Sequence, residues 1–199
     1  MKILAVSDLH NDFRQVKKLA ETAEKENVDA VVICGDITYF DEYMDGMIGP
    51  FLKKNKQVLF VPGNHDSEAT TEFISKKYKI KNLHGAAEII NGVGVFGAGW
   101  TTNVGPTFIS ESEMKKYLGR AFEKCDAEKK IMVTHIHPKG SRIEKKFKFP
   151  GSSAVAKAIY EMKPDVHLCG HIHEAEGTEE FMGRTHVFSI GKHGRIIEI

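Results

Sequence analysis

The sequence predicts an α/β fold in which two mixed β-sheets pack together and helices cover their outer faces. In the first half of the chain, apolar runs alternate with amphipathic stretches, a pattern typical of parallel strands joined by right-handed helical crossovers. In the second half, Asn91-Gly92 lies between two apolar runs and indicates an antiparallel hairpin. No internal repeat, low-complexity segment or linker divides the chain, so we expect residues 1–199 to form a single domain.

The first half contains three strand signals and three helix signals. Short apolar runs predict buried strands at residues 2–7, 29–36 and 57–64. Helical periodicity follows each run, at residues 12–27, 41–55 and 67–78. The first helix is expected to bury one face, made of Phe13, Val16, Leu19, Ala20 and Ala23. We expect Gly49-Pro50 to interrupt the second helix, because proline lacks an N–H group, and Ser67 to cap the third.

The second half predicts more strands and fewer crossovers. The hairpin covers residues 86–100, and a helix follows at residues 109–125, where Ser110 and Glu113 have the spacing of a capping box. Strands are expected at residues 129–135 and 165–171, with a helix at 153–163 between them. The tail, residues 176–199, has the pattern of short strands joined at glycine turns.

Composition excludes several classes of protein. The formal net charge of +1 gives no general attraction to nucleic acid or to anionic lipid, and no apolar run reaches the roughly 18 residues of a membrane span. We therefore expect no membrane partner. The three cysteines have neither metal-finger spacing nor an even count, so reduced thiols in a cytoplasmic protein are the simpler interpretation.

Polar side chains gather where the predicted strands end. Because loops from several strands meet at the carboxyl edge of an α/β sheet, ligands bind there. The side chains at this edge are two carboxylates, an amide and several imidazoles, from Asp8, His10, Asp36, Asn64, His65, His135, His171 and His173. Such a group would be unfavourable without a cation, and a pair of divalent metal ions removes the difficulty. Calcium prefers oxygen ligands alone and zinc fingers need cysteine, so manganese, iron, zinc, cobalt or nickel fit the donor set, and we expect manganese.

The order of these blocks, "SDLH", "CGD", "PGNHD", "VTH" and "CGHIH", resembles the calcineurin-like metallophosphoesterases. The resemblance spans about the whole chain. It implies a four-layer α/β/β/α sandwich and hydrolysis of phosphate esters by a hydroxide shared between two metal ions.

The resemblance also implies a role for each residue. Asp8, His10 and His173 would hold one metal, Asn64, His135 and His171 the other, and Asp36 would bridge both. His65 would donate a proton or hydrogen bond to the leaving oxygen. Asp66 is the candidate carboxylate partner of His65, although spacing does not identify that partner.

Departures from the family pattern indicate the substrate. Protein Ser/Thr phosphatases carry arginines after the GD and GNHE blocks, which grip a monoester dianion, whereas "GDITYF" and "GNHDSE" contain none. This favours phosphodiesters over monoesters. Asn11 and His137 are candidate substrate contacts, with loop packing as the alternative for His137.

The basic segment "KGSRIEKKFKF" is interpreted as a solvated loop, with a phosphate-binding lid as the alternative and Arg142 as its first candidate contact. Trp100 is expected to pack beneath a loop rather than to stack on a substrate base.

The sequence thus predicts a phosphodiesterase with two metal ions, acting on a small phosphorylated substrate. A nuclease is the alternative enzyme, and nucleic acid is not ruled out as a partner. A catalytically silent interaction module on the same fold is the alternative from another class. The sequence leaves the oligomeric state open, a homo-oligomer included.

Overall fold

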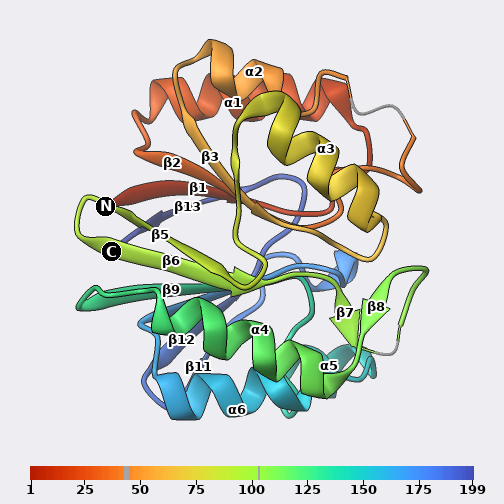
Figure 1. Cartoon of the computed structure of the whole chain (residues 1–199), viewed down its shortest axis with the longest axis vertical. Helices are drawn as coiled ribbons and strands as arrows, with labels where there is room; N and C mark the ends of the chain where they lie inside the picture. The colour runs from red at the N-terminus through yellow and green to blue at the C-terminus, as the bar shows by residue number, and fades with distance from the viewer. Residues whose placement is uncertain (43–44, 103) are drawn as a thin grey trace.

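The computed structural model describes residues 1–42, 45–102 and 104–199. It has four layers, with helices on the outside and two β-sheets face to face between them, as Figure 1 shows. The predicted α/β/β/α sandwich is therefore confirmed.

The first sheet is mainly parallel. Its strand order is β13 (Arg195–Glu198), β1 (Lys2–Val6), β2 (Ala30–Cys34), β3 (Gln57–Val61) and β4 (Lys81–Asn82). Only β13 runs antiparallel to its neighbour, β1. The outer face of the first sheet is covered by α1 (Phe13–Lys25), α2 (Gly49–Lys53) and α3 (Glu68–Tyr78).

The second sheet is mixed. Its order is β11 (Glu179–Met182), β12 (Thr185–Ser189), β10 (Val166–Cys169), β9 (Lys129–Thr134), β6 (Val93–Ala98) and β5 (Ala86–Ile90). The outer layer contains α4 (Glu111–Glu123), α5 (Arg142–Phe147) and α6 (Ser153–Met162), and a small ribbon pairs β7 (Thr101–Thr102) with β8 (Phe108–Ile109). The 3-10 turn η1 (His173–Ala175) follows β10. The hairpin between β5 and β6 turns at Asn91-Gly92, where φ is +49° and +78°, as the sequence predicts.

The core consists of three apolar layers. The middle layer lies between the sheets and includes Ile3, Val32, Leu59, Val95 and Leu168, all inaccessible to solvent. Because side chains alternate along a strand, the neighbouring residues of each strand face the helices instead. They form one cluster under α1, α2 and α3 and another under α4 and α6.

Two local predictions differ from the structure, and part of a third falls on residues that the structure does not describe. Phe13 opens α1 but is 37% exposed, whereas Val16, Leu19, Ala20 and Ala23 are buried as expected. Gly49-Pro50 begins α2 instead of interrupting a longer helix, because the first turn needs no N–H donor from proline. Tyr43 and Met44, part of the predicted 41–55 helix, lie outside the described residues.

The parallel strands of both sheets end at the same side of the molecule. In Figure 1 they run from the side of the two termini toward the side that carries β7 and β8. The polar blocks of the sequence therefore meet at one edge. Among the described residues, no helix is long and apolar enough to cross a bilayer.

Candidate metal centre

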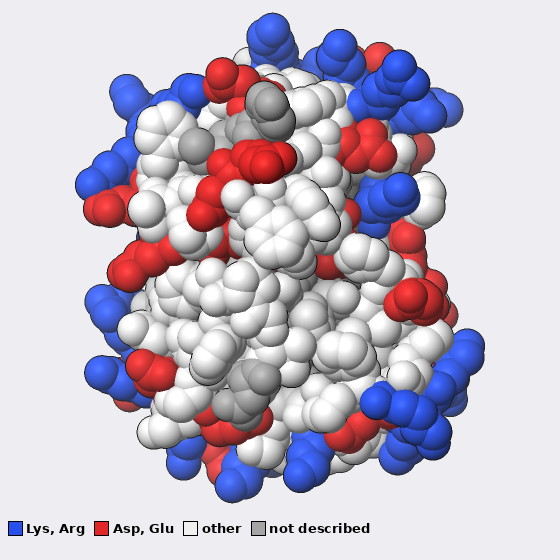
Figure 2. All heavy atoms as spheres, turned by 90° about the vertical axis from the view of Figure 1, so that its right-hand side faces the viewer, with Lys and Arg blue, Asp and Glu red and all other residues white. Residues whose placement is uncertain are grey.

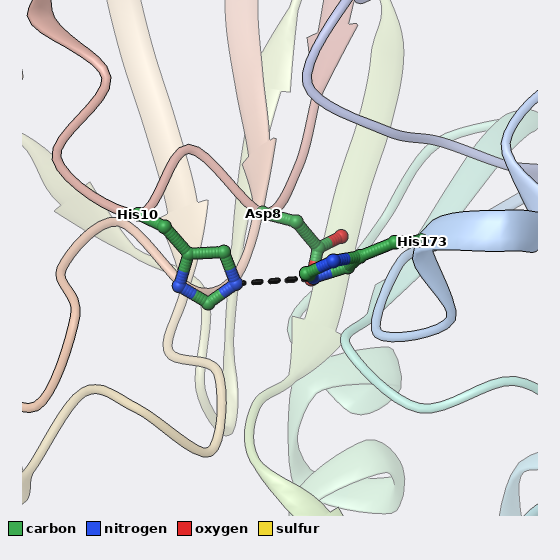
Figure 3. Close-up of side chains that lie close together, drawn as sticks. All are labelled: Asp8, His10 and His173. Carbon is green, nitrogen blue, oxygen red and sulfur yellow. Dashed lines mark hydrogen bonds and ion pairs between the residues drawn. The ribbon is translucent and has the colours of Figure 1, made fainter.

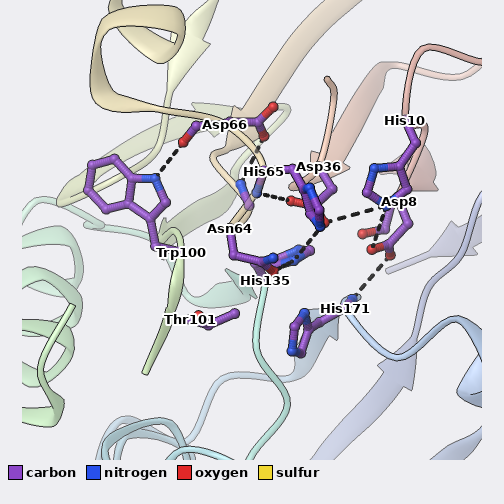
Figure 4. Close-up of polar contacts among 12 residues, drawn as sticks. Asp8, His10, Asp36, Asn64, His65, Asp66, Trp100, Thr101, His135 and His171 are labelled. Carbon is purple, nitrogen blue, oxygen red and sulfur yellow. Dashed lines mark hydrogen bonds and ion pairs between the residues drawn. The ribbon is translucent and has the colours of Figure 1, made fainter. Parts of the chain in front are cut away.

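The carboxyl ends of five strands bring the predicted metal ligands together. Figure 4 shows the side chains that follow β1, β2, β3, β9 and β10 converging on one point. Of the seven predicted ligands, only His10, His171 and His173 are not fully buried. The ligand roles themselves stay predictions. The distances and hydrogen bonds among these side chains support them.

Asp8, His10 and His173 form the first group of donors. Their ligand atoms lie within 4.8 Å of one another. His10 Nε2 is 3.1 Å from His173 Nε2, and Asp8 Oδ1 is 3.5 Å from His173 Nε2, as drawn in Figure 3. The other oxygen, Asp8 Oδ2, accepts a hydrogen bond from the backbone N–H of His171 at 3.1 Å. This bond leaves Oδ1 directed at the two imidazoles.

Asp36 stands between the two groups of donors. Its Oδ2 atom is 3.5 Å from His10 Nε2 on one side and 3.4 Å from His135 Nε2 on the other. Its Oδ1 atom accepts a hydrogen bond from the backbone N–H of His65 at 2.9 Å. One carboxylate oxygen is thus fixed by the backbone and the other faces both groups, which is the position that a bridging ligand needs.

Asn64, His135 and His171 form the second group. His135 Nδ1 lies 2.8 Å from the carbonyl oxygen of Cys34, so this nitrogen carries the proton and donates it. His135 Nε2 then faces Asn64 Oδ1 at 3.0 Å. His171 Nε2 is buried and has no hydrogen-bond partner among the described residues. Its ring lies 5.1 Å from that of His135, centroid to centroid.

The charges of the centre shift the pKa values of its members. Burial alone would lower the pKa of His135, but the adjacent Asp36 carboxylate raises it to about 9. Burial would raise the pKa of Asp36, yet His135 holds it well below its usual range. Burial, reinforced by His135, lowers the pKa of His171 to about 3. A proton on His135 and the Asp36 carboxylate therefore stabilise each other, and a metal ion at His135 Nε2 would take the place of that proton.

A divalent cation fits this arrangement. If His135 were neutral, its bare Nε2 would face the Asn64 oxygen, so either a proton or a metal ion must lie there. Asp8 Oδ1 and His171 Nε2 are buried without a hydrogen bond from any described residue, which is costly unless a cation is bound. Mixed imidazole and oxygen donors suit a transition metal or zinc better than calcium.

Backbone strain and close packing hold these side chains in place. Asp8, His10, Asp36 and His171 all have positive φ, between +41° and +75°, a conformation that non-glycine residues adopt at a cost and that clusters at functional sites. Gly63 permits the contact between the loops after β2 and β3, because a Cβ atom there would collide with Asp36 Oδ1. Gly170 of the "CGHIH" block is needed for packing in the same way, because a Cβ atom there would collide with Ser7 Oγ.

His65 and Asp66 follow β3 but face different surroundings. The ligand atoms of His65, His10 and Asp36 lie within 4.8 Å of one another. This geometry allows His65 either to contact a metal ion or to donate a proton. The Asp66 carboxylate makes no hydrogen bond to that ring. It accepts hydrogen bonds from the backbone N–H groups of Ile37, Thr38 and Gly63. Burial, together with Asp36, raises the pKa of Asp66 to about 6.

The remaining predicted residues lie around the centre rather than in it. Asn11 directly follows His10 and has a buried Oδ1 without a hydrogen-bond partner among the described residues. His137 is inaccessible and its Nε2 contacts the carbonyl oxygen of Phe149 at 3.0 Å, which supports the loop-packing interpretation. Arg142 contacts the carbonyl oxygen of Glu179 on β11 through Nη1, at 3.4 Å.

The structure also shows where Trp100 and the basic segment, residues 139–149, lie. Trp100 is 8% exposed and donates from Nε1 to the carbonyl oxygen of Asp66, as Figure 4 shows. It packs beneath the loop, as expected. The segment predicted as a solvated loop instead contains α5, which Ser141 caps by accepting a hydrogen bond from Glu144 N.

Two cavities open on the centre, and several of their residues were missed by sequence reasoning. Cavity one, of about 350 Å³, adds Asp12, Glu176, Lys192 and His193 to Asp8, His10 and His173. Cavity two, of about 540 Å³, is lined by Asp36, Asn64, His65, Phe147, Phe149, His171, Ile172, His173 and Glu174. The spacing "FKF" at 147–149 is a signal for paired aromatic rings, but the lysines beside them favoured the interpretation of a solvated loop.

Figure 2 shows the face of the molecule at the carboxyl edge of the sheets. Uncharged residues occupy most of its centre, Asp and Glu lie in small groups among them, and Lys and Arg gather at the outer rim. Among the described residues that line the two cavities, Lys192 is the only Lys or Arg, and its Nζ lies 4.0 Å from Asp12 Oδ2.

Comparison of the sequence with known families and proteins gives two matches. The family model described as the calcineurin-like phosphoesterase superfamily domain matches residues 1–197. An uncharacterized protein of Methanocaldococcus jannaschii, MJ1162, is 30% identical over 184 residues, which cover 88% of this chain and 81% of that protein.

Three solved structures share the fold. TT1561 of Thermus thermophilus superimposes with a TM-score of 0.78 at 18% identity, covering 96% of this chain and 90% of its own. A dimetal phosphatase from Danio rerio has a TM-score of 0.67 at 12% identity, covering 96% and 88%. An archaeal phosphodiesterase has a TM-score of 0.55 at 20% identity, covering 96% and 84%. At these identities the likeness establishes the fold alone.

Proposed function

The chain belongs to the calcineurin-like phosphoesterase superfamily, a family of metal-dependent hydrolases, and on this premise we propose that it is a binuclear phosphodiesterase. The observation that carries the proposal is the position of Asp36 Oδ2, within 3.5 Å of an imidazole from each group of donors. A carboxylate in that position serves two ions at once. The Danio rerio neighbour is described as a dimetal phosphatase, which agrees with two ions on this fold.

Asp8, His10 and His173 would hold one ion and Asn64, His135 and His171 the other, with Asp36 shared. Manganese suits the mixed oxygen and imidazole donors. When bound, such ions polarise the phosphate ester and make water nucleophilic near neutral pH. The backbone N–H groups of His65 and His171 fix the carboxylate oxygens that face away from the centre, so the remaining donors keep their orientation during turnover.

His65 would act as the general acid. It lines cavity two next to Asp36 and Asn64, and its Nδ1 is buried, which leaves Nε2 as the ring atom for a substrate. A proton delivered from Nε2 neutralises the leaving oxygen as the bond to phosphorus breaks. Asp66 would take no proton in this step, because its carboxylate is engaged with Ile37, Thr38 and Gly63.

The charges around the centre favour a diester over a monoester. A monoester dianion carries more negative charge than a diester, so its binding requires more cationic side chains, usually arginines. In the described part of the chain, the cavity linings provide Lys192 as their one Lys or Arg, and it already lies beside Asp12. Two cavities on the two sides of the donors also match a phosphate that carries two substituents. A phosphodiesterase and a phosphatase both occur among the structural neighbours, so the preference rests on the charges of this site.

A small substrate fits better than a nucleic acid. Lys and Arg lie at the rim of this face instead of forming a continuous stripe across it (Figure 2), whereas polymer binding relies on rows of such contacts. A silent interaction module is disfavoured because every predicted ligand is present and convergent. Buried free thiols at Cys34, Cys125 and Cys169 support the proposal that the protein acts in the cytoplasm.

The test compares two chromogenic esters. With Mn²⁺ bound, bis-p-nitrophenyl phosphate should be hydrolysed with at least about tenfold higher kcat/KM than p-nitrophenyl phosphate, a difference of about 1.4 kcal/mol in activation free energy. Metal analysis of the same sample should give two ions per chain. A clear preference for the monoester would overturn the diester assignment, and one ion per chain would overturn the binuclear one.

A further inference from the structure

The two cavities beside the donors differ in chemistry. Cavity one has a polar far wall, in which Glu176 accepts hydrogen bonds from the backbone N–H of His193 at 2.9 Å and from its ring Nδ1 at 2.8 Å. Cavity two has Phe147 and Phe149 in the corresponding position. Because His173 lines both, a phosphate held at the donors can extend one substituent into each.

The aromatic wall of cavity two is held in place. Phe149 lies edge-on to His171, with ring centroids 5.4 Å apart and an interplanar angle of 78°. His137 fixes the Phe149 backbone by donating from Nε2 to its carbonyl oxygen. Phe147 and Phe149 are half-buried and pack against the apolar layer beneath α4 and α6. The rings are therefore anchored from below, and part of each stays open to the cavity.

His65 lines cavity two, and it also contacts two aromatic rings that lie outside the lining of that cavity. The Tyr39 ring stacks on the His65 ring at 5.3 Å, with an angle of 13°, and the Phe40 ring meets it edge-on at 4.4 Å. Tyr39 is 49% exposed and Phe40 is 51% exposed, so neither ring is there to fill the core.

The loop that carries these rings is strained and braced. Phe40 and Asp41 both have positive φ, +51° and +62°, which is unusual for a bulky aromatic residue. Asp41 Oδ1 accepts a hydrogen bond from the backbone N–H of Ser67 at 2.9 Å, and Thr38 Oγ1 donates to the carbonyl oxygen of His65 at 3.2 Å. The fold thus maintains exposed aromatic rings beside the general acid at a conformational cost, a pattern that indicates a binding role.

We propose that the leaving group of the diester is a planar ring, which enters cavity two between His65, held from behind by Tyr39 and Phe40, and the Phe147–Phe149 wall. The orientation follows from His65, because the group that it protonates must lie in the cavity that it lines. The substituent that stays on phosphorus then lies in cavity one and is polar, suited to Glu176, Lys192 and His193. This inference rests on the proposed function and specifies its substrate class: aryl or heteroaromatic diesters rather than diesters of alkyl alcohols.

Turnover provides the first test. Methyl phenyl phosphate and methyl hexafluoroisopropyl phosphate share the retained group and release alcohols of similar acidity, so their rates compare shape rather than leaving-group chemistry. With Mn²⁺ bound, the native chain should prefer the phenyl ester at least tenfold in kcat/KM. In Phe149→Leu and in Phe147→Leu, that preference should fall at least threefold. Phe73→Leu, which changes a 45%-exposed ring on α3 outside both cavities, should keep it.

Binding provides a second readout that needs no turnover. In methyl benzylphosphonate and methyl hexylphosphonate, carbon replaces the scissile oxygen. Calorimetry should show the benzyl compound binding about tenfold more tightly to the native chain and losing that advantage in Phe149→Leu. Circular dichroism and the melting temperature of each variant establish that it is folded.

The outcomes separate the inference from the proposed function. Equal rates and equal affinities for the aryl and alkyl compounds would overturn the planar-ring inference while the phosphodiesterase assignment stood. Selective benzyl binding without hydrolysis of any diester would overturn the phosphodiesterase assignment and support the aromatic cavity. Loss of selectivity in Phe73→Leu equal to that in Phe149→Leu would also count against the inference, because the effect would not come from cavity two.

Discussion

At the scale of single residues, Asp36 and His65 are neighbours with different surroundings. Asp36 is 2% exposed and faces imidazoles of both donor groups, whereas the ring of His65 lines a cavity and contacts aromatic side chains. We therefore expect Asp36→Ala to lose bound metal, because it removes the shared ligand. His65→Ala should retain the metal and lose about 10²- to 10⁴-fold in kcat, the usual contribution of a general acid. Metal analysis and steady-state kinetics measure both.

The acid and ligand roles of His65 are separable by the same pair of variants. Loss of both ions from His65→Ala would show that its ring is a ligand, as the grouping of His10, Asp36 and His65 allows. Asp66→Asn is a useful comparison. It should reduce stability, because the carboxylate joins the loops after β2 and β3.

His167 provides a pH-dependent prediction away from the centre. Thr134 donates its hydroxyl proton to the carbonyl oxygen of Ile136, so it accepts from His167 Nε2 at 2.8 Å. Nδ1 is then bare and buried without a partner among the described residues. Burial lowers the pKa of His167 to about 3. The unfolded chain binds a proton at this histidine below about pH 6.5, but the folded protein does not until about pH 3.

It follows that the stability linked to His167 is complete above about pH 6.5 and falls as the pH drops toward 3. One such histidine contributes a slope of about 1.4 kcal/mol per pH unit inside that window. Urea unfolding between about pH 6.5 and about pH 4.5, with chelator present, measures it. His167→Gln keeps a donor for Thr134 and removes the titration, so its slope should be smaller by that amount. Equal slopes for the two proteins would show that His167 is protonated in the fold.

At this scale the sequence predicted the residues that follow strand ends but not the side-chain contacts between loops. Asp8, Asp36 and His135 each follow an apolar run, and the parallel order of the strands brings them to one edge. The surroundings of Asp66 depend on how the loop after β2 docks on the loop after β3, which the spacing of residues does not encode. The spacing of residues also does not encode the contact between the Phe149 ring and His171, because the position of Phe149 depends on the preceding helix, α5.

At the scale of secondary-structure elements, α4 and α6 are joined by Glu111. Its carboxylate accepts hydrogen bonds from the backbone N–H groups of Ser153 and Ala154 and from the Ser152 hydroxyl. These groups lie at the N-terminus of α6, where a negative charge is also favoured by the helix dipole. The bonds hold the pKa of Glu111 below its ordinary value, although burial opposes them.

We predict that Glu111→Ala lowers the free energy of unfolding by about 2 kcal/mol, because N–H groups of α6 lose a charged acceptor. For a chain of this size that corresponds to roughly 4–8 °C in melting temperature. Glu123→Ala removes the same charge from the exposed last residue of α4 and should change the melting temperature by less than about 1 °C. A similar shift in both variants would mean that the loss of a carboxylate in general, rather than the loss of the cap on α6, is responsible.

The elements with strong local signals were predictable, and the exceptions have physical reasons. Ser110 and Glu113 form the expected capping box at the start of α4, and Asn91-Gly92 turns the β5–β6 hairpin. The segment of α5 was interpreted as a loop because its lysines hide a short apolar pattern. Ile143 is buried there while Lys145 and Lys146 are not, and a single buried anchor is too weak a periodic signal to identify a helix.

At the scale of the whole molecule, the metal centre joins the two sheets. Asp8, Asp36 and Asn64 follow strands of the first sheet, and His135 and His171 follow strands of the second. The middle of the interface between the sheets is a layer of apolar side chains. The two-sheet architecture was predictable because strand signals outnumber helix signals in the second half. The distance between the donors of the first sheet and the donors of the second depends on how the two sheets dock. Local sequence patterns do not determine that docking.

Since the native fold assembles donors from both sheets and the unfolded chain does not, metal binding should stabilise the whole molecule. A ligand present at about 100 times its dissociation constant adds about 2.7 kcal/mol, so saturating Mn²⁺ should raise the melting temperature by several degrees over the chelator-treated protein. Ca²⁺ should have little effect, because it prefers oxygen donors and the centre is rich in imidazole. Scanning calorimetry with Mn²⁺, Ca²⁺ or chelator measures these shifts, and Asp36→Ala is the matched control, since it lacks the shared carboxylate but keeps the other donors. If Mn²⁺ stabilised Asp36→Ala as much as the native chain, the ions would be bound elsewhere, and the junction of the two sheets would not be the metal centre.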